Sequence, residues 1–222
     1  MLKYKLRKIF SKRRNAMIKV ERISVMNFEN AIRGARNPLN SWARMDSSYD
    51  EKGNYILGPN DLSLATKLAK AGSDHRKFLR QIMVSMDITA PLYWWKEFDT
   101  YKVGTVANST STMHKIQAKE FERDDFSIDR LTPDALAVMD SLIAYLEGER
   151  VKYNETKDKA SWHNMIQLLP SSYNQMRTVT MNYEVLINVY YARKTHKLAE
   201  WHTLCEVIEG LPYAKELILV KE

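Results

Sequence analysis

The sequence predicts a single α/β (α+β) domain with an antiparallel or mixed sheet and long helices. The chain has 222 residues, 45% of them hydrophobic, which is enough to bury one substantial core. Residues 82–89 alternate apolar and polar side chains, the period of a half-buried strand. Pro91 follows at once and predicts the start of a helix, because a first turn does not need the N–H that proline lacks.

The N-terminal residues 1–16 are predicted to be a basic extension of a domain that spans residues 17–222. Seven of the 34 Lys and Arg residues fall within the first 14 positions, which contain no acidic residue. The remainder holds 27 basic and 27 acidic residues, so the net charge of +7 belongs to this tail. Such a tail can contact nucleic-acid phosphates or an acidic membrane surface, or it can be a solvated extension. Met17 would serve as an alternative start.

Between the tail and the strand at 82–89, the pattern predicts a strand, a short helix, a long loop and a second helix. Apolar and polar residues alternate from residue 17 onwards, and a short helix is expected near residues 29–33. Residues 36–60 are rich in Asn, Ser, Asp, Gly and Pro, with a turn at residues 50–54. Asn60 and Asp61 are expected to cap a helix that Gly72 closes.

The second half is predicted to be mostly helical. Residues 104–125 form a polar loop, after which Thr132 caps a helix that continues to about Asn154. A further helix is expected over residues 158–168, before Pro170. Helical spacing over residues 175–209 predicts one long final helix, stopped by the sequence Gly-Leu-Pro at 210–212.

Several classes of protein are disfavoured. Cys205 is the single cysteine, which excludes an intramolecular disulfide, and we expect it to be a small core residue. No apolar run approaches the roughly 20 residues of a membrane span, so we expect a soluble, cytoplasmic protein without a membrane span. His196 and His202 are six apart, whereas a helical metal pair needs a spacing of three or four, and no metal site is predicted. Glycine-rich nucleotide-binding motifs are absent from the sequence.

Polar and aromatic groups in the apolar segments offer candidate binding residues. On a helix, Arg193 would lie about 20° from Asn182, while Asn188 would lie about 240° away. These groups are either solvated in a monomer or serve two adjacent pockets in an oligomer. The aromatic run Tyr93-Trp94-Trp95 could stack on a flavin or a base, although such a cluster after a strand is more often core.

At these residues the chain resembles the flavin-dependent thymidylate synthases, over about residues 75–105 and 169–193. Lys102 and Thr105 correspond to the last Arg and the Ser of the family's Arg-His-Arg-x-x-Ser signature. The segment 108–114 resembles Asn-x-x-Ser-x-Arg-Tyr and keeps Asn108 and Ser111. Leu169-Pro170 and the spacing of Asn182, Leu186, Asn188 and Arg193 match the family's C-terminal part.

The resemblance implies the fold of that family, a homotetramer with pockets between subunits, and methylation of the pyrimidine nucleotide dUMP. FAD would be the cofactor, with methylenetetrahydrofolate and NADPH as co-substrates. No enzyme nucleophile is required, because the flavin carries the hydride. The implied substrate contacts are Arg193, Ser111, Lys96, Glu97 and Asn108. The implied cofactor contacts are Asn182, Asn188, His75, Lys102 and Thr105.

Two positions depart from the family pattern. Met113 stands where an Arg would hold substrate phosphate, and Glu184 replaces an Arg that meets FAD, which reverses the local charge. Basic residues at positions 76, 77, 80, 96 and 102 could compensate. The alternatives are a non-catalytic protein that retains the fold and binds a nucleotide or, through its tail, a nucleic acid, and an enzyme that modifies a different nucleotide.

Overall fold

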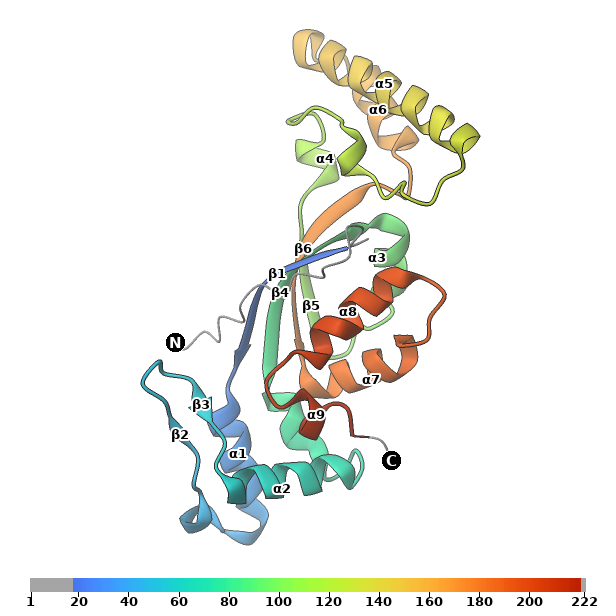
Figure 1. Cartoon of the computed structure of the whole chain (residues 1–222). Coiled ribbons are helices and arrows are strands. Elements are labelled where there is room, and N and C mark those ends of the chain that lie inside the picture. Colours follow the sequence, from blue (N-terminus) through green and yellow to red (C-terminus); the bar gives the residue numbers. More distant parts are fainter. Residues whose placement is uncertain (1–17, 221–222) are drawn as a thin grey trace.

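A four-stranded antiparallel sheet forms the centre of the computed structural model, which describes residues 18–220 (Figure 1). The strand order is β1-β4-β6-β5, so β4 and β6 are the two inner strands. Nine residue pairs join β4 to β6, from Met83 opposite Asn182 to Pro91 opposite Asn174. The strands are β1 (Lys19–Met26), β4 (Met83–Pro91), β5 (Thr105–Ser109) and β6 (Asn174–Asn182).

The two faces of β4 follow the alternation read from the sequence. Val84, Met86 and Ile88 are buried, while Ser85 and Asp87 are half-buried on the opposite face. Helices α7 (Tyr183–Arg193) and α8 (Ala199–Glu209) cover the apolar face (Figure 1). On the other face, Thr178 of β6 donates a 2.6 Å hydrogen bond to Asp87. The predicted strand at 82–89 is therefore confirmed.

An aromatic cluster fills the space between the sheet and α8. Helix α3 (Leu92–Phe98) follows β4 directly and supplies Trp94, Trp95 and Phe98, all buried. The ring of Trp94 lies 4.6 Å from that of Trp201 in α8 and stacks on Phe98 at 5.2 Å. Full burial of such side chains contributes about 1.5–3 kcal/mol each. Core packing is confirmed for Trp94 and Trp95, and neither ring is exposed to stack on a ligand.

Short helices and a small hairpin pack at one end of the sheet. The predicted loop at 36–60 contains two 3-10 turns and a two-stranded hairpin, whose turn lies at the expected residues 50–54. These elements are α1 (Phe28–Arg36), η1 (Asn37–Leu39), η2 (Trp42–Arg44), β2 (Ser48–Tyr49), β3 (Tyr55–Ile56), α2 (Pro59–Lys70), η3 (Arg76–Gln81) and α9 (Ala214–Leu217).

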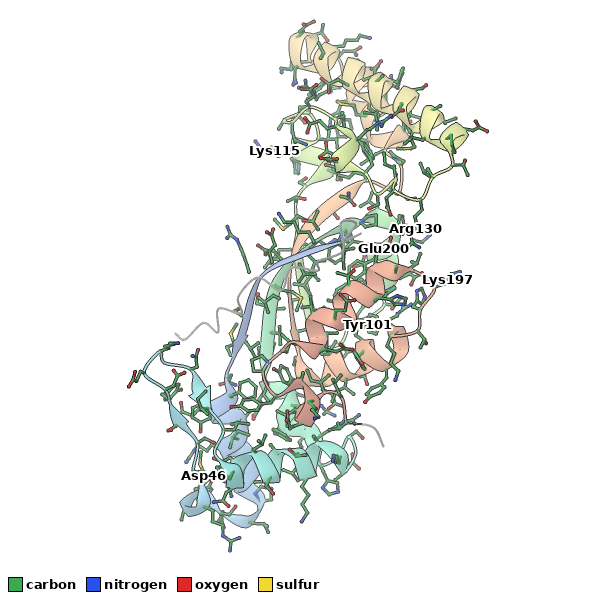
Figure 2. All side chains as sticks on the ribbon, in the orientation of Figure 1. Asp46, Tyr101, Lys115, Arg130, Lys197 and Glu200 are labelled. Carbon is green, nitrogen blue, oxygen red and sulfur yellow. The ribbon has the colours of Figure 1, made fainter. Side chains whose placement is uncertain are left out.

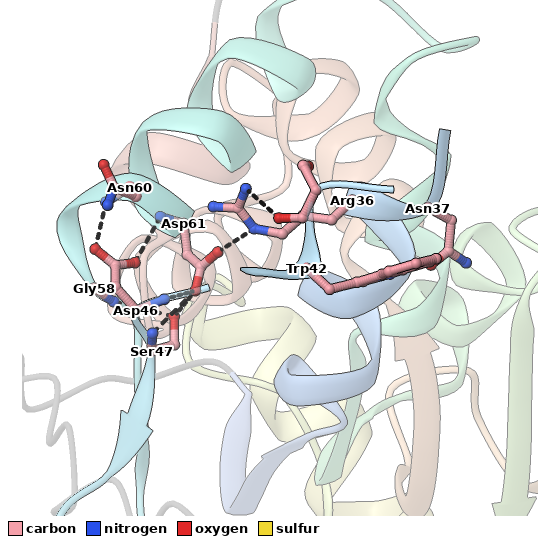
Figure 3. A network of polar contacts seen from close by, with 9 residues as sticks. Arg36, Asn37, Trp42, Asp46, Ser47, Gly58, Asn60 and Asp61 are labelled. Carbon is pink, nitrogen blue, oxygen red and sulfur yellow. Dashed lines mark hydrogen bonds and ion pairs between the residues drawn. The ribbon is translucent and has the colours of Figure 1, made fainter. Parts of the chain in front are cut away.

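A buried polar network holds α1, the loop and α2 together (Figure 3). Asp61 accepts hydrogen bonds from Arg36 Nε at 2.6 Å, from Ser47 Oγ at 2.5 Å and from two backbone N–H groups. Asp46 in turn accepts from the backbone N–H groups of Asn60 and Asp61. The predicted cap at Asn60-Asp61 is wrong, because α2 begins at Pro59 and Asp46, distant in sequence, caps its first turn.

A helical hairpin extends beyond the other end of the sheet (Figure 1). Helices α5 (Pro133–Thr156) and α6 (Lys159–Leu168) pack on each other and on the segment that contains α4 (Thr112–Lys115) and η4 (Arg123–Asp125). Leu146 and Met165 are fully buried in a second hydrophobic cluster. Thr132 caps α5 as predicted, by accepting a hydrogen bond from the N–H of Ala135. Asp158, predicted as the first residue of the second helix, instead caps α6 by accepting a hydrogen bond from the N–H of Ala160.

The prediction of one helix over residues 175–209 is wrong. Its first part is strand β6, and a break at residues 194–198 separates α7 from α8. Gly210 ends α8 as expected. Strand β5 lies in a segment that was predicted to be a loop, and it forms because β6 offers it a pairing edge. The predicted basic tail, residues 1–16, lies outside the described residues.

Strand β1 is interrupted in its pairing with β4. The register shifts between Glu21 and Ser24, and Arg22 has a positive φ of 50°. This irregularity is a β-bulge, in which an extra residue bends the strand and breaks the hydrogen-bond ladder.

Candidate functional site

Side chains from helices α3, α7 and α8 and from the loops after α3 and α7 meet around the carboxylate of Glu97, at the end of α3. Its Oε2 lies 2.8 Å from Nη1 of Arg193, in the last turn of α7. Trp201 Nε1 donates to the same oxygen at 3.2 Å, and His196 Nε2 lies 3.4 Å away. Nε of Arg193 donates to the hydroxyl of Tyr101 at 2.9 Å. We call these five residues the Glu97 cluster.

The Glu97 cluster brings together two residues predicted to contact substrate, Glu97 and Arg193. The guanidinium also lies 4.5 Å from the ring centroid of Trp201, a cation–π contact. Arg193 and Glu97 remain 17% and 33% exposed, so both side chains can reach a bound molecule. Lys96, also predicted to contact substrate, is exposed beside them. The predicted phosphate contact of Arg193 would compete with its bond to Glu97.

The N-terminus of α7 is the second candidate region, and Asn182 caps it. The Asn182 side chain accepts a hydrogen bond from the N–H of Val185 at 3.0 Å, which explains why this residue ends the strand and begins the helix. Its amide nitrogen faces Gly104: a Cβ on Gly104 would lie 2.9 Å from Nδ2. Asn182 thus lies at the cap rather than inside a helix, and the predicted angular relation to Arg193 does not apply.

Thr105 lies beside Asn182, the other residue predicted to contact the cofactor. It is paired with Met181 in the β5–β6 register. Its hydroxyl is buried and has no hydrogen-bond partner among the described residues. Buried hydroxyls are normally paired, so this group is a candidate for a ligand contact. Lys102 is exposed two residues before Gly104.

The reversed charge at Glu184 is compensated within the chain. Glu184 lies in the first turn of α7 and accepts from Arg76 Nε at 3.1 and 3.2 Å. The side chain of Arg76 is 12% exposed and that of Glu184 is 13% exposed. A carboxylate is favourable at a helix N-terminus, and its cation partner makes the pair neutral. The charge of Arg76 is therefore used to neutralise Glu184, which reduces what it can contribute to binding a ligand phosphate.

The remaining predicted residues are spread over the surface. Asn188 is exposed on α7, and His75 is exposed where η3 begins. Asn108 is exposed on β5 opposite Thr178, and Ser111 accepts from the N–H of His114 at the start of α4. Because β5 runs away from the N-terminus of α7, Asn108 and Ser111 lie towards the helical hairpin. One copy of the chain therefore does not gather all predicted substrate contacts in one place.

The sequence did not predict a contact between half-buried Tyr93 and buried Glu200. The hydroxyl of Tyr93 donates to Oε1 of Glu200, which is 1% exposed, and Oε2 of Glu200 has no partner within the described part of the chain. Burial, and then the Glu200 carboxylate, raise the pKa of Tyr93 well above its ordinary value. Figure 2 shows Glu200 at the start of α8 and Tyr101 further along the same side of the sheet. The pair is 107 residues apart in sequence, and no local pattern signals it.

Metal binding and membrane insertion find no support in the described residues. No group of three or more His, Cys, Asp or Glu side chains is placed to hold a metal ion there. No described helix combines the length and the apolar character needed to cross a bilayer.

The fold is that of the flavin-dependent thymidylate synthases. A crystal structure of ThyX from Helicobacter pylori complexed with FAD and dUMP superimposes with a TM-score of 0.63, covering 92% of this chain and 99% of that one, at 16% identity. A second structure of the same protein with FAD and dUMP gives a TM-score of 0.62 over 90% and 95% of the two chains, also at 16% identity. No protein-family model matches the sequence, and no curated protein does.

Proposed function

We propose that the chain is a diverged relative of the flavin-dependent thymidylate synthases that binds FAD and a pyrimidine deoxynucleotide, with dUMP as the first candidate. The observation that carries the proposal is the fold shared with ThyX structures that hold FAD and dUMP, over nearly the whole of both chains. The donors around the N-terminus of α7 support it. Fold alone does not define activity, so the proposal rests on these residues as well.

On the cofactor side, the residues present suit a flavin nucleotide. The amide nitrogen of Asn182 and the unpartnered hydroxyl of Thr105 are neighbouring hydrogen-bond donors. Lys102 adds a positive charge next to them, and Arg76 neutralises Glu184, which would otherwise repel a phosphate. His75 and Asn188 are assigned to the same cofactor on resemblance. When bound, FAD would supply the hydride for the reaction, with NADPH as its reductant.

On the substrate side, the Glu97 cluster offers one anion and one cation. The guanidinium of Arg193 suits a phosphate, and the carboxylate of Glu97 can accept the N–H of a pyrimidine imide. The Trp201 and Tyr101 contacts fix the orientation of Arg193, so little of its freedom is lost on binding. Methylenetetrahydrofolate is the proposed carbon donor, and the chain's own task is to bind and orient the reactants.

We propose a homotetramer because the assigned substrate residues are separated in one copy. Asn108 and Ser111 lie towards the helical hairpin, whereas Glu97 of α3 and Arg193 of α7 lie beside α8. A pocket between subunits can combine a pair from one copy with a pair from another. Light scattering of the purified protein measures the assembly directly, and a monomeric mass would contradict this part of the proposal.

A non-catalytic nucleotide-binding protein is the second candidate. The bond between Glu97 and Arg193 satisfies both charges within one chain, which weakens the attraction for a phosphate. Such a protein would bind a nucleotide without transferring a methyl group. Nucleic-acid binding by the basic tail belongs to this alternative.

The test is the absorbance spectrum of the purified protein with and without added FAD, followed by titration with dUMP. We expect bound flavin and a spectral change on addition of dUMP. A nucleotide-dependent flavin signal without formation of dTMP from methylenetetrahydrofolate would favour the second candidate. Absence of flavin binding would contradict the proposed function.

A further inference from the structure

A cavity of about 800 Å³ lies between the 3-10 turns η1 and η2 and the outer side of α2. It is a hollow that is open to solvent, and its volume is within the range of pockets that hold small molecules. None of the residues assigned above to flavin or substrate lines it. The cavity is therefore a second, separate candidate site.

The lining of this cavity is basic. Arg36, Arg44 and Lys67 contribute three positive charges, and no acidic residue lines the cavity. Arg44 and Lys67 are exposed, and neither has an ion-pair partner among residues 18–220. Arg44 and Lys67 attract an anion to this hollow, because neither has an ion-pair partner among the described residues, whereas Arg36 is already paired with Asp61.

Arg36 is the fixed element of the cavity wall. Its side chain is only 4% exposed, and Asp61 holds Nε at 2.6 Å (Figure 3). Nη1 makes a long contact of 3.4 Å to the carbonyl of Ser41, and Nη2 has no partner within the described chain. The buried pair therefore fixes the guanidinium in the wall of the hollow, where Nη2 keeps a hydrogen-bonding capacity that the described residues do not use.

Neutral donors and apolar side chains complete the lining. Asn40, Asn60 and Ser63 supply side-chain amide and hydroxyl groups. The start of α2 adds no backbone donor here, because Asp46 already accepts from the N–H groups of Asn60 and Asp61. Leu64 and Leu39, which is 83% exposed, give the cavity an apolar wall.

We propose that this cavity binds a small phosphorylated ligand that also carries an apolar or planar part, with the dimensions of a nucleotide. Arg44, Lys67 and Nη2 of Arg36 would hold the phosphate through charge-assisted hydrogen bonds. The leucine side chains would cover the apolar part. The site is independent of the proposed flavin and dUMP site.

Isothermal titration calorimetry with inorganic pyrophosphate and with adenosine diphosphate, at low salt, tests this proposal. We expect both probes to bind and adenosine diphosphate to bind more tightly, because only it reaches the apolar wall. Arg44→Ala and Lys67→Ala should each weaken binding about tenfold, the typical effect of losing a charge-assisted contact. Arg36 is left unchanged, because its removal would leave Asp61 as an unpaired buried charge.

Two control variants locate the binding. Lys70→Ala removes an exposed charge from the same helix, one turn beyond Lys67 and outside the cavity, and should leave the affinity unchanged. Asn182→Ala should also leave it unchanged, although adenosine diphosphate is part of FAD, because Asn182 belongs to the other site. The proposal is overturned if neither probe binds, if pyrophosphate binds as tightly as adenosine diphosphate, or if the Arg44→Ala/Lys67→Ala double variant binds like the native protein.

Discussion

Asp46 and Asp61 cap each other: each carboxylate accepts a hydrogen bond from the backbone N–H of the other residue. The Asp61 carboxylate also pairs with Arg36, and both side chains are almost fully buried. This arrangement fixes the loop before α2 on the end of α1. The stability of that end of the molecule therefore depends on one carboxylate.

Replacement of Asp61 by Ala should lower the free energy of unfolding by about 3–5 kcal/mol, because it leaves Arg36 as a buried unpaired charge. Urea denaturation measures this change. Asp74→Ala, at an exposed position of the same residue type, should change the free energy of unfolding by less than about 0.5 kcal/mol. If the two substitutions lowered the free energy of unfolding equally, the Asp61 network would not be a main source of stability.

The same carboxylate should make stability depend on pH. Burial alone would raise the pKa of Asp61, but hydrogen bonds from Ser47 and Arg36 outweigh it and hold the pKa below its ordinary value. A lowered pKa stabilises the folded state above the unfolded-state value and loses that contribution as pH falls through the folded-state value. We therefore expect a loss of stability below about pH 4 that is smaller in Asp61→Asn, measured by urea denaturation at several pH values.

Substitution by alanine should destabilise the folded protein at Gly104 and stabilise it at Gly148. Gly104 has a φ of +74°, and a Cβ there would meet Asn182 at 2.9 Å, so Gly104→Ala should cost about 1–2 kcal/mol or more. Gly148 lies within α5 with open space around it, and Gly148→Ala should stabilise by about 0.5–1 kcal/mol. Thermal denaturation of both variants checks the signs, and a stabilised Gly104→Ala would exclude the close approach.

Two substitutions of Asn182 should distinguish its role as a helix cap from its proposed role in flavin binding. Asn182→Ala should cost about 1 kcal/mol through loss of the cap and should also weaken FAD binding. Asn182→Asp keeps a capping oxygen but replaces the amide donor by a negative charge, so it should retain stability and still bind FAD poorly. Thr132→Ala removes the corresponding cap of α5 and serves as the control, with a stability loss and normal FAD affinity. Normal FAD binding by Asn182→Asp would remove Asn182 from the site.

Arg193→Ala should weaken dUMP binding about tenfold or more, because the substrate side would lose its oriented guanidinium. Arg193→Lys should recover only part of the affinity, since lysine provides neither the planar fork nor the stacking on Trp201. Lys197→Ala is the matched control, an exposed cation four residues on. Titration calorimetry with dUMP provides the measurement, and native affinity in Arg193→Ala would exclude Arg193 as a substrate contact.

Cys205 should be unreactive in the folded protein. The thiol is buried, and burial followed by Glu209 and Glu206 raises its pKa to about 12, so little thiolate forms at pH 8. A chromogenic disulfide reagent should label it only after unfolding. Rapid stoichiometric labelling of the native protein would show that the side chain is accessible.

The alternation of apolar and polar residues in the sequence predicted strand β4, but the pattern in the segment of β6 fitted either a strand or a helix. Val179 and Met181 alternate with Thr178 and Thr180, which is a strand pattern, yet the same segment continues into the helical spacing of α7. The segment forms a strand because β4 pairs with one of its edges and β5 with the other. Likewise, β5 has the composition of a loop and extends only through that pairing.

The candidate site was predictable in part. Local spacing and resemblance singled out Asn182, Thr105 and Arg193 as candidates. In the structure Asn182 caps α7, Thr105 places a hydroxyl next to it, and Arg193 forms an ion pair with Glu97. The partners of Arg193 and Glu184 were not predictable, because Glu97 and Arg76 are 96 and 108 residues away in sequence. Such contacts depend on how helices pack across the sheet, which no local pattern encodes.

The bulge in β1 has a consequence for how the protein behaves in concentrated solution. Within the described residues, β1 is an outer strand of the sheet, and an outer strand with a regular hydrogen-bond ladder can recruit strands from other molecules. The shifted register at Arg22 and the charged side chains of Lys19 and Glu21 leave only short regular stretches on this edge. The β1 edge is thereby a poor template for strand-by-strand aggregation.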